Sequence, residues 1–214
     1  MKTILHYGLV LLIIAGVAGV GLSLVDRITK EPIKAAQSKR LEEGQKLAFP
    51  SASSFGELKK VETKGKTISY YEVFDESKNV IGYELLYQVG GYQSQIKVLS
   101  GIEPDGKVVA IRVLEQAETP GLGAEVDALP SNDTIVSAIK GLFSSKEEKS
   151  EESQIPWFQA QFSGKTPEDL IVVKTKDPKH ITALSGATIT STAVTKAVKE
   201  PIELFLKAKA EGQL

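Results

Sequence analysis

A turn rich in small residues and hydroxyl groups stands near the C-terminus, directly before an amphipathic helix. It reads Ser185-Gly186-Ala187-Thr188, and Thr190 follows within the helix. The unpaired N–H groups and partial positive charge of a helix N-terminus suit a phosphate, and Gly186 lets the backbone approach a ligand closely. Thr188 and Thr190 each offer a hydroxyl that could hydrogen-bond a phosphate or hold one covalently. The plainer alternative is an ordinary helix start, in which Ser185 or Thr188 caps the first N–H groups.

A second segment has the composition of a loop that lies against a flat ligand: Glu118-Thr119-Pro120-Gly121-Leu122-Gly123. Pro120 fixes one backbone dihedral, and the two glycines permit tight turns and close approach. Leu122 could present an apolar face to an aromatic ring, and Glu118 could hydrogen-bond the loop or the ligand. The alternative is a plain turn between two elements, which Pro-Gly dipeptides usually mark.

Three segments, in the same order, resemble motifs of the FMN-binding domain family. Ser185 to Thr188 resembles its flavinylation motif S/T-G-A-T, and Glu118 to Gly123 resembles its E-T-P-G-L-G loop. Between them, Trp157-Phe158 and the stretch 161–165 (Gln-Phe-Ser-Gly-Lys) resemble its W…QF-x-G-K segment. Within the family the chain most resembles the G subunits of Rnf electron transport complexes, and next the C subunits of sodium-translocating NADH:quinone reductases. The resemblance covers nearly the whole chain.

The resemblance implies a tethered flavin. In the family, the last threonine of S-G-A-T bears FMN through a phosphoester that a separate flavin transferase makes outside the cytoplasm, and Thr188 occupies that position. We therefore expect one covalent FMN per chain, with Thr190 as the rival acceptor. The residues expected to bind FMN are those of the two motifs: Ser185, Gly186, Ala187, Thr188, Thr190, Glu118, Thr119, Pro120, Gly121, Leu122 and Gly123.

The resemblance also implies an electron relay. We expect a membrane-anchored flavoprotein subunit of an ion-translocating ferredoxin:NAD oxidoreductase, without independent substrate turnover. Its implied partners are the other membrane and peripheral subunits of the Rnf complex, the flavin transferase and membrane lipid. The alternatives are a C-type quinone reductase subunit, a cofactor-free extracytoplasmic module that binds a protein through the P-G-L-G loop, and a free-standing flavin reductase. The last would need a nicotinamide site, and the sequence contains no G-x-G-x-x-G fingerprint.

Two positions depart from the family pattern. Thr182 stands where an Asp commonly precedes the motif's serine by three residues, and Gln116 stands where a His commonly precedes the E-T-P-G-L-G loop by two. The first bears on recognition by the transferase, and the second weakens any role in proton transfer near the flavin. No general acid or base stands out, which fits a carrier of electrons.

Composition excludes several other kinds of site. The net charge of −1 gives no bulk attraction to nucleic acid. Because the chain has no cysteine, it can hold no disulfide, no thiolate-bound zinc and no iron–sulfur cluster of its own. Its two histidines, His6 and His180, lie far apart in sequence, so a histidine metal site is not expected.

The N-terminal segment predicts a single span of the inner (cytoplasmic) membrane. Tyr7 to Val25 has no charged residue and would extend about 28 Å as a helix, enough for the hydrocarbon core. A cleaved signal peptide is the alternative, but the run is long for one and no clean cleavage site follows. Positive charges after the span favour a cytoplasmic domain, whereas the family implies an extracytoplasmic one. We follow the family, because long domains are translocated largely regardless of charge.

The rest of the chain predicts an α+β fold, in which a single N-terminal transmembrane helix is followed by an FMN-binding domain with a mostly antiparallel sheet and packed helices. We expect an anchor over residues 1–29, a helical stalk and linker over 30–55, and the FMN-binding domain over 56–214, with an insertion at 130–153 that holds a helix from Thr134 to Phe143. Alternation and turn signals predict strands at 68–74, 80–89, 92–99 and 108–114, and a short one at 170–174. A final helix from Thr190 to Lys209 should be kinked or divided at Pro201, and Trp157 is expected in the core.

Overall fold

Helix α1 (Lys2–Ala48) forms the N-terminal part of the chain and runs on through Pro32. The computed structural model describes residues 2–63, 65–128 and 155–213, and its contacts separate a first unit, up to Leu41, from a second that starts at Glu42. The large apolar side chains of the first unit from Ile4 to Ile33 are exposed. By length and composition α1 could cross a membrane, and no other helix within the described ranges meets the same test. The predicted helix and insertion at 130–153 lie outside the described residues.

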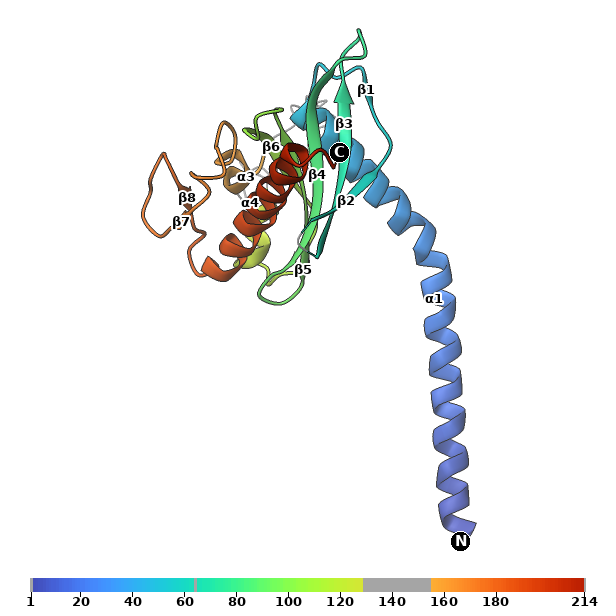
Figure 1. Ribbon diagram of the computed structural model, residues 1–214. Coiled ribbons are helices and arrows are strands. Elements are labelled where there is room, and N and C mark those ends of the chain that lie inside the picture. Colours follow the sequence, from blue (N-terminus) through green and yellow to red (C-terminus); the bar gives the residue numbers. More distant parts are fainter. Residues whose placement is uncertain (1, 64, 129–154, 214) are drawn as a thin grey trace, which may run out of the picture. The chain divides into compact units, whose positions relative to one another are not determined.

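The second unit is built on a six-stranded antiparallel sheet (Figure 1). Its order is β1-β3-β4-β5-β6, and β2 pairs with β3 as well. The strands are β1 (Ser54–Phe55), β2 (Lys59–Thr63), β3 (Lys66–Phe74), β4 (Val80–Gly90), β5 (Gln95–Ile102) and β6 (Val108–Glu115). The expected α+β fold and its four main strands are confirmed. Strand β2 was missed because only Val61 and Thr63 of its five residues face inward, which is too few for a visible alternation.

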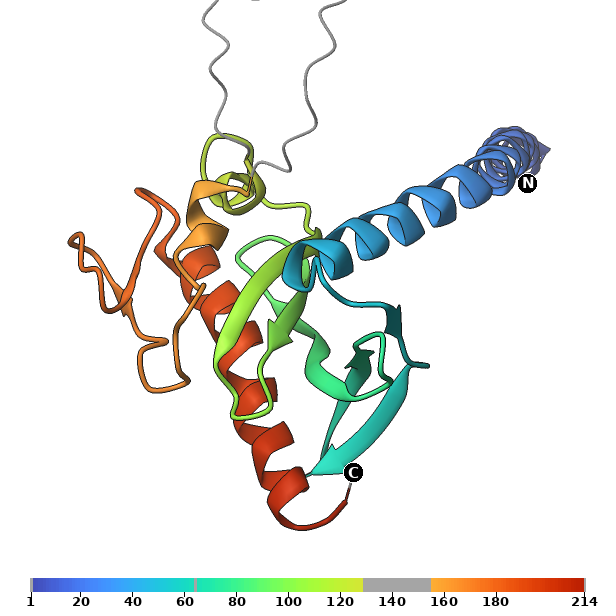
Figure 2. The ribbon, with the colours of Figure 1, turned by 90° about the horizontal axis from the view of Figure 1, so that it is seen from above.

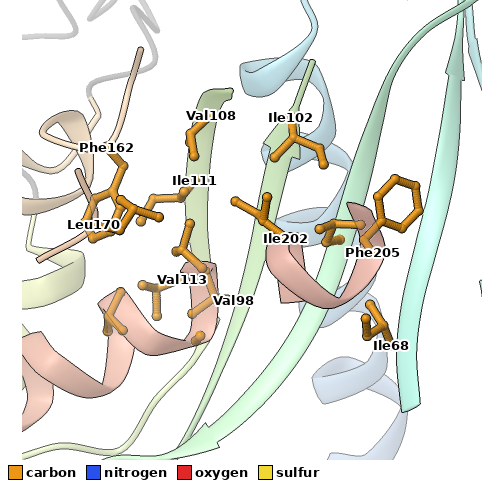
Figure 3. Close-up of a cluster of buried hydrophobic side chains, with 14 of the residues drawn as sticks. Ile68, Val98, Ile102, Val108, Ile111, Val113, Phe162, Leu170, Ile202 and Phe205 are labelled. Carbon is orange, nitrogen blue, oxygen red and sulfur yellow. The ribbon is translucent and has the colours of Figure 1, made fainter. Parts of the chain in front are cut away.

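Helix α4 (Thr188–Ala210) covers one face of this sheet (Figure 2). Its inward side chains, among them Ile202 and Phe205, meet Ile68, Val98 and Ile102 from the strands in one apolar core (Figure 3). Of the kink or division expected at Pro201, the division is wrong, since α4 is a single element over its whole length. Pro201 is buried in the packed face, so the packing of its neighbours offsets the backbone hydrogen bond that a proline cannot donate.

The end of α1 covers the opposite face of the sheet. A Cβ on Gly82 would lie 2.4 Å from Phe49 Cζ, and one on Gly101 would lie 2.5 Å from Ala48 Cβ. Glycine at these strand positions therefore lets the helix end approach the sheet closely. The last turns of the helix that the sequence assigned to a stalk thus belong to the packed unit.

A layer of short elements covers the β6 side (Figures 1 and 2). It contains η1 (Gly123–Asp127), α3 (Trp157–Ala160), β7 (Val172–Val173) and β8 (Ile181–Thr182), and β7 and β8 pair in parallel. The strand predicted at 170–174 shortens to β7, and β8 was not expected. The placement of Trp157 in the core is wrong, because its side chain is 53% exposed, while Phe158 and Phe162 are fully buried instead.

Candidate functional site

The S-G-A-T turn leads directly into α4. The helix starts at Thr188 after Ala187, and no side chain caps its first N–H groups. Gly186 has φ +74°, a left-handed conformation that glycine adopts without strain. The alternative of a start capped by Ser185 or Thr188 is therefore wrong. Ser191 holds the turn from inside the helix, because its Oγ accepts a hydrogen bond from Leu184 N (3.0 Å) and donates one to Ala187 O (2.9 Å).

The two threonines that could accept a phosphate have opposite surroundings. Thr188 is the first helical residue and its side chain is exposed. Thr190 is only 2% exposed, and its Oγ1 donates a hydrogen bond to Glu118 Oε2 at 2.7 Å. A hydroxyl buried in this way cannot be reached without breaking that hydrogen bond, so Thr188 is the accessible one of the two.

Glu118 joins three segments of the site. Its carboxylate accepts hydrogen bonds from the backbone N–H groups of Tyr92, Gln93 and Ser94, at 2.9–3.2 Å, and from the hydroxyls of Ser94 and Thr190. Burial disfavours the charged form, but the hydrogen bonds outweigh it and lower the pKa of Glu118 to about 2. The group is thus a fixed anion that ties the β4–β5 turn and the start of α4 to the E-T-P-G-L-G loop. Protein groups therefore already occupy both of its oxygens.

The P-G-L-G tip is a tight turn on the surface. Thr119 O accepts hydrogen bonds from Leu122 N (3.1 Å) and Ala124 N (3.2 Å), and Gly121 at the exposed tip has φ +73°. Leu122 is 44% exposed. A Cβ on Gly186 would lie 2.9 Å from Leu122 Cδ2, so the loop touches the S-G-A-T turn where the turn has no side chain.

Close packing fixes the base of the same loop. A Cβ on Gly123 would lie 2.6 Å from Thr190 Oγ1, and one on Gly91 would lie 2.6 Å from Glu118 Oε1. Neither position can hold a side chain without moving the Glu118–Thr190 pair. The structure therefore brings the two predicted motifs together, and it adds the β4–β5 turn as a third member.

An open hollow of about 320 Å³ adjoins Thr188, a size within the range of small-molecule sites. It lies between the end of β4 and the exposed side of α4. Its lining residues are Val89, Gly90, Thr188, Ile189, Thr192, Ala193 and Lys196. Ile189, at 58% exposure, gives this region an apolar side chain, and Lys196 gives it a positive charge.

Sequence reasoning missed the residues that support the two motifs through hydrogen bonds. The sequence predicts a turn at Gly90-Gly91 but gives no sign that the residues just after it supply most of the hydrogen bonds to Glu118. Two glutamines of the W…QF segment, Gln159 and Gln161, contact the elements next to each motif. Gln161 belongs to the stretch that resembles the family's QF-x-G-K segment, whereas the only signal for Gln159 was its place between Trp157 and that stretch.

Comparison with known proteins gives one family and several relatives. Residues 91–203 match the family described as FMN-binding domain. The G subunit of the sodium-translocating ferredoxin:NAD(+) oxidoreductase complex of Acetobacterium woodii is 29% identical over 95% of this chain and 92% of its own. The G subunit of an ion-translocating oxidoreductase complex of Methanosarcina acetivorans is 28% identical over 90% and 89%. Among solved structures, Shewanella oneidensis NqrC aligns with a TM-score of 0.45 and 21% identity over 75% of this chain and 74% of its own.

Proposed function

Since the chain belongs to the FMN-binding domain family, we propose that it is the membrane-anchored, electron-carrying flavoprotein subunit of an ion-translocating ferredoxin:NAD oxidoreductase complex. The family supports FMN as the cofactor. Relatives that align over nearly their whole length are G subunits of such complexes, which supports the other subunits as partners. The apolar part of α1 supports a membrane location. Bound FMN supplies reversible acceptance and donation of electrons.

We propose further that FMN is joined covalently to Thr188, one per chain. The observation that supports this most directly is the exposed Thr188 hydroxyl at the first residue of a helix whose N-terminus no side chain caps. Unpaired N–H groups and the helix dipole favour a phosphate at that place. Gly186 and the buried Ala187 add no large side chain of their own next to this hydroxyl.

The attachment is a transfer of a phosphoryl-linked flavin to the hydroxyl. The Oγ–H bond of Thr188 breaks and an Oγ–P bond forms, while the pyrophosphate bond of a flavin dinucleotide breaks, so that a nucleoside monophosphate leaves and the proton passes to a base of the transferase. The flavin transferase is thus a required partner in maturation. In this chain α4 presents the hydroxyl, the S-G-A-T turn keeps the approach open, and Leu122 offers an exposed apolar surface beside the turn.

The relay role predicts that the flavin does not react directly with nicotinamide. We expect the detergent-solubilised, flavin-loaded full chain to be bleached by dithionite and to stay oxidised with NADH, because no motif for a nicotinamide site is present in the sequence. Absorbance of the oxidised flavin in a stopped-flow instrument measures both reactions. Rapid bleaching by NADH alone, with saturation kinetics, would identify a free-standing reductase instead.

We propose that the residues from Arg27 onward lie outside the cytoplasm, where the transferase acts. Alkaline phosphatase fused after Leu214 should be active, and a fluorescent protein that folds only in the cytoplasm should be dark at the same position. The reverse pair of results would place the domain in the cytoplasm, as the positive charges after the span favour.

A further inference from the structure

Gln161 is hydrogen-bonded to strand β8, which leads into the S-G-A-T turn. Its Oε1 accepts a hydrogen bond from Thr182 N (2.8 Å), and its Nε2 donates one to Thr182 O (3.3 Å). The other edge of β8 pairs with β7. There Ile181 N donates a hydrogen bond to Ile171 O (2.9 Å), and Ala183 N donates one to Val173 O (2.8 Å). Since successive residues of a strand present their backbone groups to opposite edges, Gln161 takes the place of a second partner strand.

Gln159 is hydrogen-bonded to η1, the element that follows the P-G-L-G loop. Its side chain is 1% exposed, and its Nε2 donates hydrogen bonds to Val126 O (2.9 Å) and Asp127 Oδ1 (3.0 Å) in η1. Its Oε1 accepts one from Val113 N of β6 (3.4 Å). The amide therefore ties η1, which begins at Gly123, to the central sheet.

Both glutamines extend from one rigid turn. Phe158 and Phe162 flank them in sequence, are fully buried, and pack edge to face with ring centroids 5.6 Å apart (Figure 3 shows Phe162 in the core). The backbone of α3 is thus fixed by the core. The two loops of the site are held from the same short turn, through amides two residues apart.

The P-G-L-G loop and the S-G-A-T turn contact each other closely, so neither can move far without disturbing the other. Leu122 lies where a Cβ on Gly186 would be 2.9 Å away, and Thr190 Oγ1 lies 2.7 Å from Glu118 Oε2. A shift of either loop by a fraction of an ångström changes these contacts. Each amide both donates and accepts, which neither a carboxylate nor an apolar side chain can do.

We propose that Gln159 and Gln161 are positioning residues of the flavin site, an inference that rests on the proposed function. Gln161 holds the acceptor turn so that Thr188 is presented to the transferase. Gln159 holds the P-G-L-G loop against that turn and so sets the surroundings of the attached flavin. Gln161 bonds only the backbone of residue 182, so these hydrogen bonds can form with any side chain there. The presence of Thr182 where the family commonly has Asp therefore leaves this support of the turn in place.

The two roles are separated by two variants and three measurements on the detergent-solubilised full chain. Gln161→Ala should slow the initial rate of flavin attachment by purified transferase about tenfold, and amide exchange at Thr182 should become about tenfold faster, because a hydrogen-bonded grip is lost. The reduction potential of the flavin that does attach should match the wild type. Gln159→Met keeps the length of the side chain and removes the hydrogen bonds of the amide. This variant should attach flavin at the wild-type rate and shift the reduction potential. Gln88→Glu, at an exposed position of strand β4, is the control and should change none of these.

The outcomes separate this inference from the proposed function. If the wild-type chain takes up no covalent flavin, the proposed function fails. If the wild type takes it up and Gln161→Ala does so equally fast, or Gln159→Met leaves the potential unchanged, the positioning roles are wrong. Variants that only lower the melting temperature, with rate and potential of the folded fraction unchanged, would show that the glutamines serve stability alone.

Discussion

The Thr188→Val variant should hold no covalent flavin. Valine has nearly the shape of threonine but lacks the hydroxyl, so no phosphoester can form, and the exposed position should tolerate it without loss of fold. The measurement is flavin fluorescence of the denatured protein on a gel, after expression with the transferase. We expect a fluorescent band for the wild type and none for the variant, a complete loss.

Neighbouring threonines provide matched controls. Thr192→Val alters another exposed threonine of α4, whose hydroxyl donates to Thr188 O (2.8 Å), and should keep the fluorescent band. Thr190→Val removes the hydrogen bond to Glu118 and should also keep it, with lower stability. Fluorescence that persists in Thr188→Val and disappears in Thr190→Val would move the attachment site to Thr190.

A second large effect concerns Glu84, a carboxyl enclosed between the sheet and the end of α1. Its side chain is fully buried, and within the described part of the chain neither carboxylate oxygen has a hydrogen-bond partner. Burial raises the pKa of Glu84 from 4.5 to about 7, and the Gln45 side chain acts in the opposite direction with a smaller effect. Tyr71 faces Glu84 from β3, while Gly101 opposite it on β5 has no side chain to offer.

The raised pKa makes folding less favourable as pH rises. Well below pH 4.5 Glu84 is protonated in both the folded and the unfolded chain, so its ionisation does not change the free energy of unfolding there. Between pH 4.5 and about 7 the unfolded chain releases its proton first, so stability falls, by about 3 kcal/mol in all, and stays lower above pH 7. Glu84→Gln should therefore raise the free energy of unfolding at pH 8 by about that amount and change it little at pH 4.

Denaturant unfolding of the detergent-solubilised chain at the two pH values measures this difference. Glu62→Gln, an exposed glutamate on β2, is the matched control and should leave the pH dependence as in the wild type. Equal stability of Glu84→Gln and wild type at pH 8 would mean that Glu84 gains a compensating partner in solution.

The main strands and α4 could be predicted because their patterns are local. In β3 the buried Ile68 and Tyr70 alternate with the less buried Ser69 and Tyr71, and the α4 stripe repeats with helical spacing. Trp157 could not be placed in this way, because its size favours burial while its position at the start of α3 leaves it on the surface. The two-residue strands β7 and β8 are too short for any period to appear.

The two motifs of the site were visible in the sequence, but their support was not. The partners of Glu118 come from residues 24–26 positions before it and 72 after it. The hydrogen bonds of the Gln159 and Gln161 amides to backbone groups likewise join residues 21–46 positions apart. Such pairings follow from the three-dimensional arrangement of the sheet, and no local pattern predicts them.

The most direct test of the central claim is fragmentation mass spectrometry of the tryptic peptide His180–Lys196 from the chain matured with its transferase. This peptide contains Thr182, Ser185, Thr188 and Thr190, so a single spectrum distinguishes all candidate acceptors. We predict one added FMN, less one water, on Thr188 and an unmodified Thr190. An unmodified peptide from protein that binds FMN, or a flavin located on any other residue, would contradict the account.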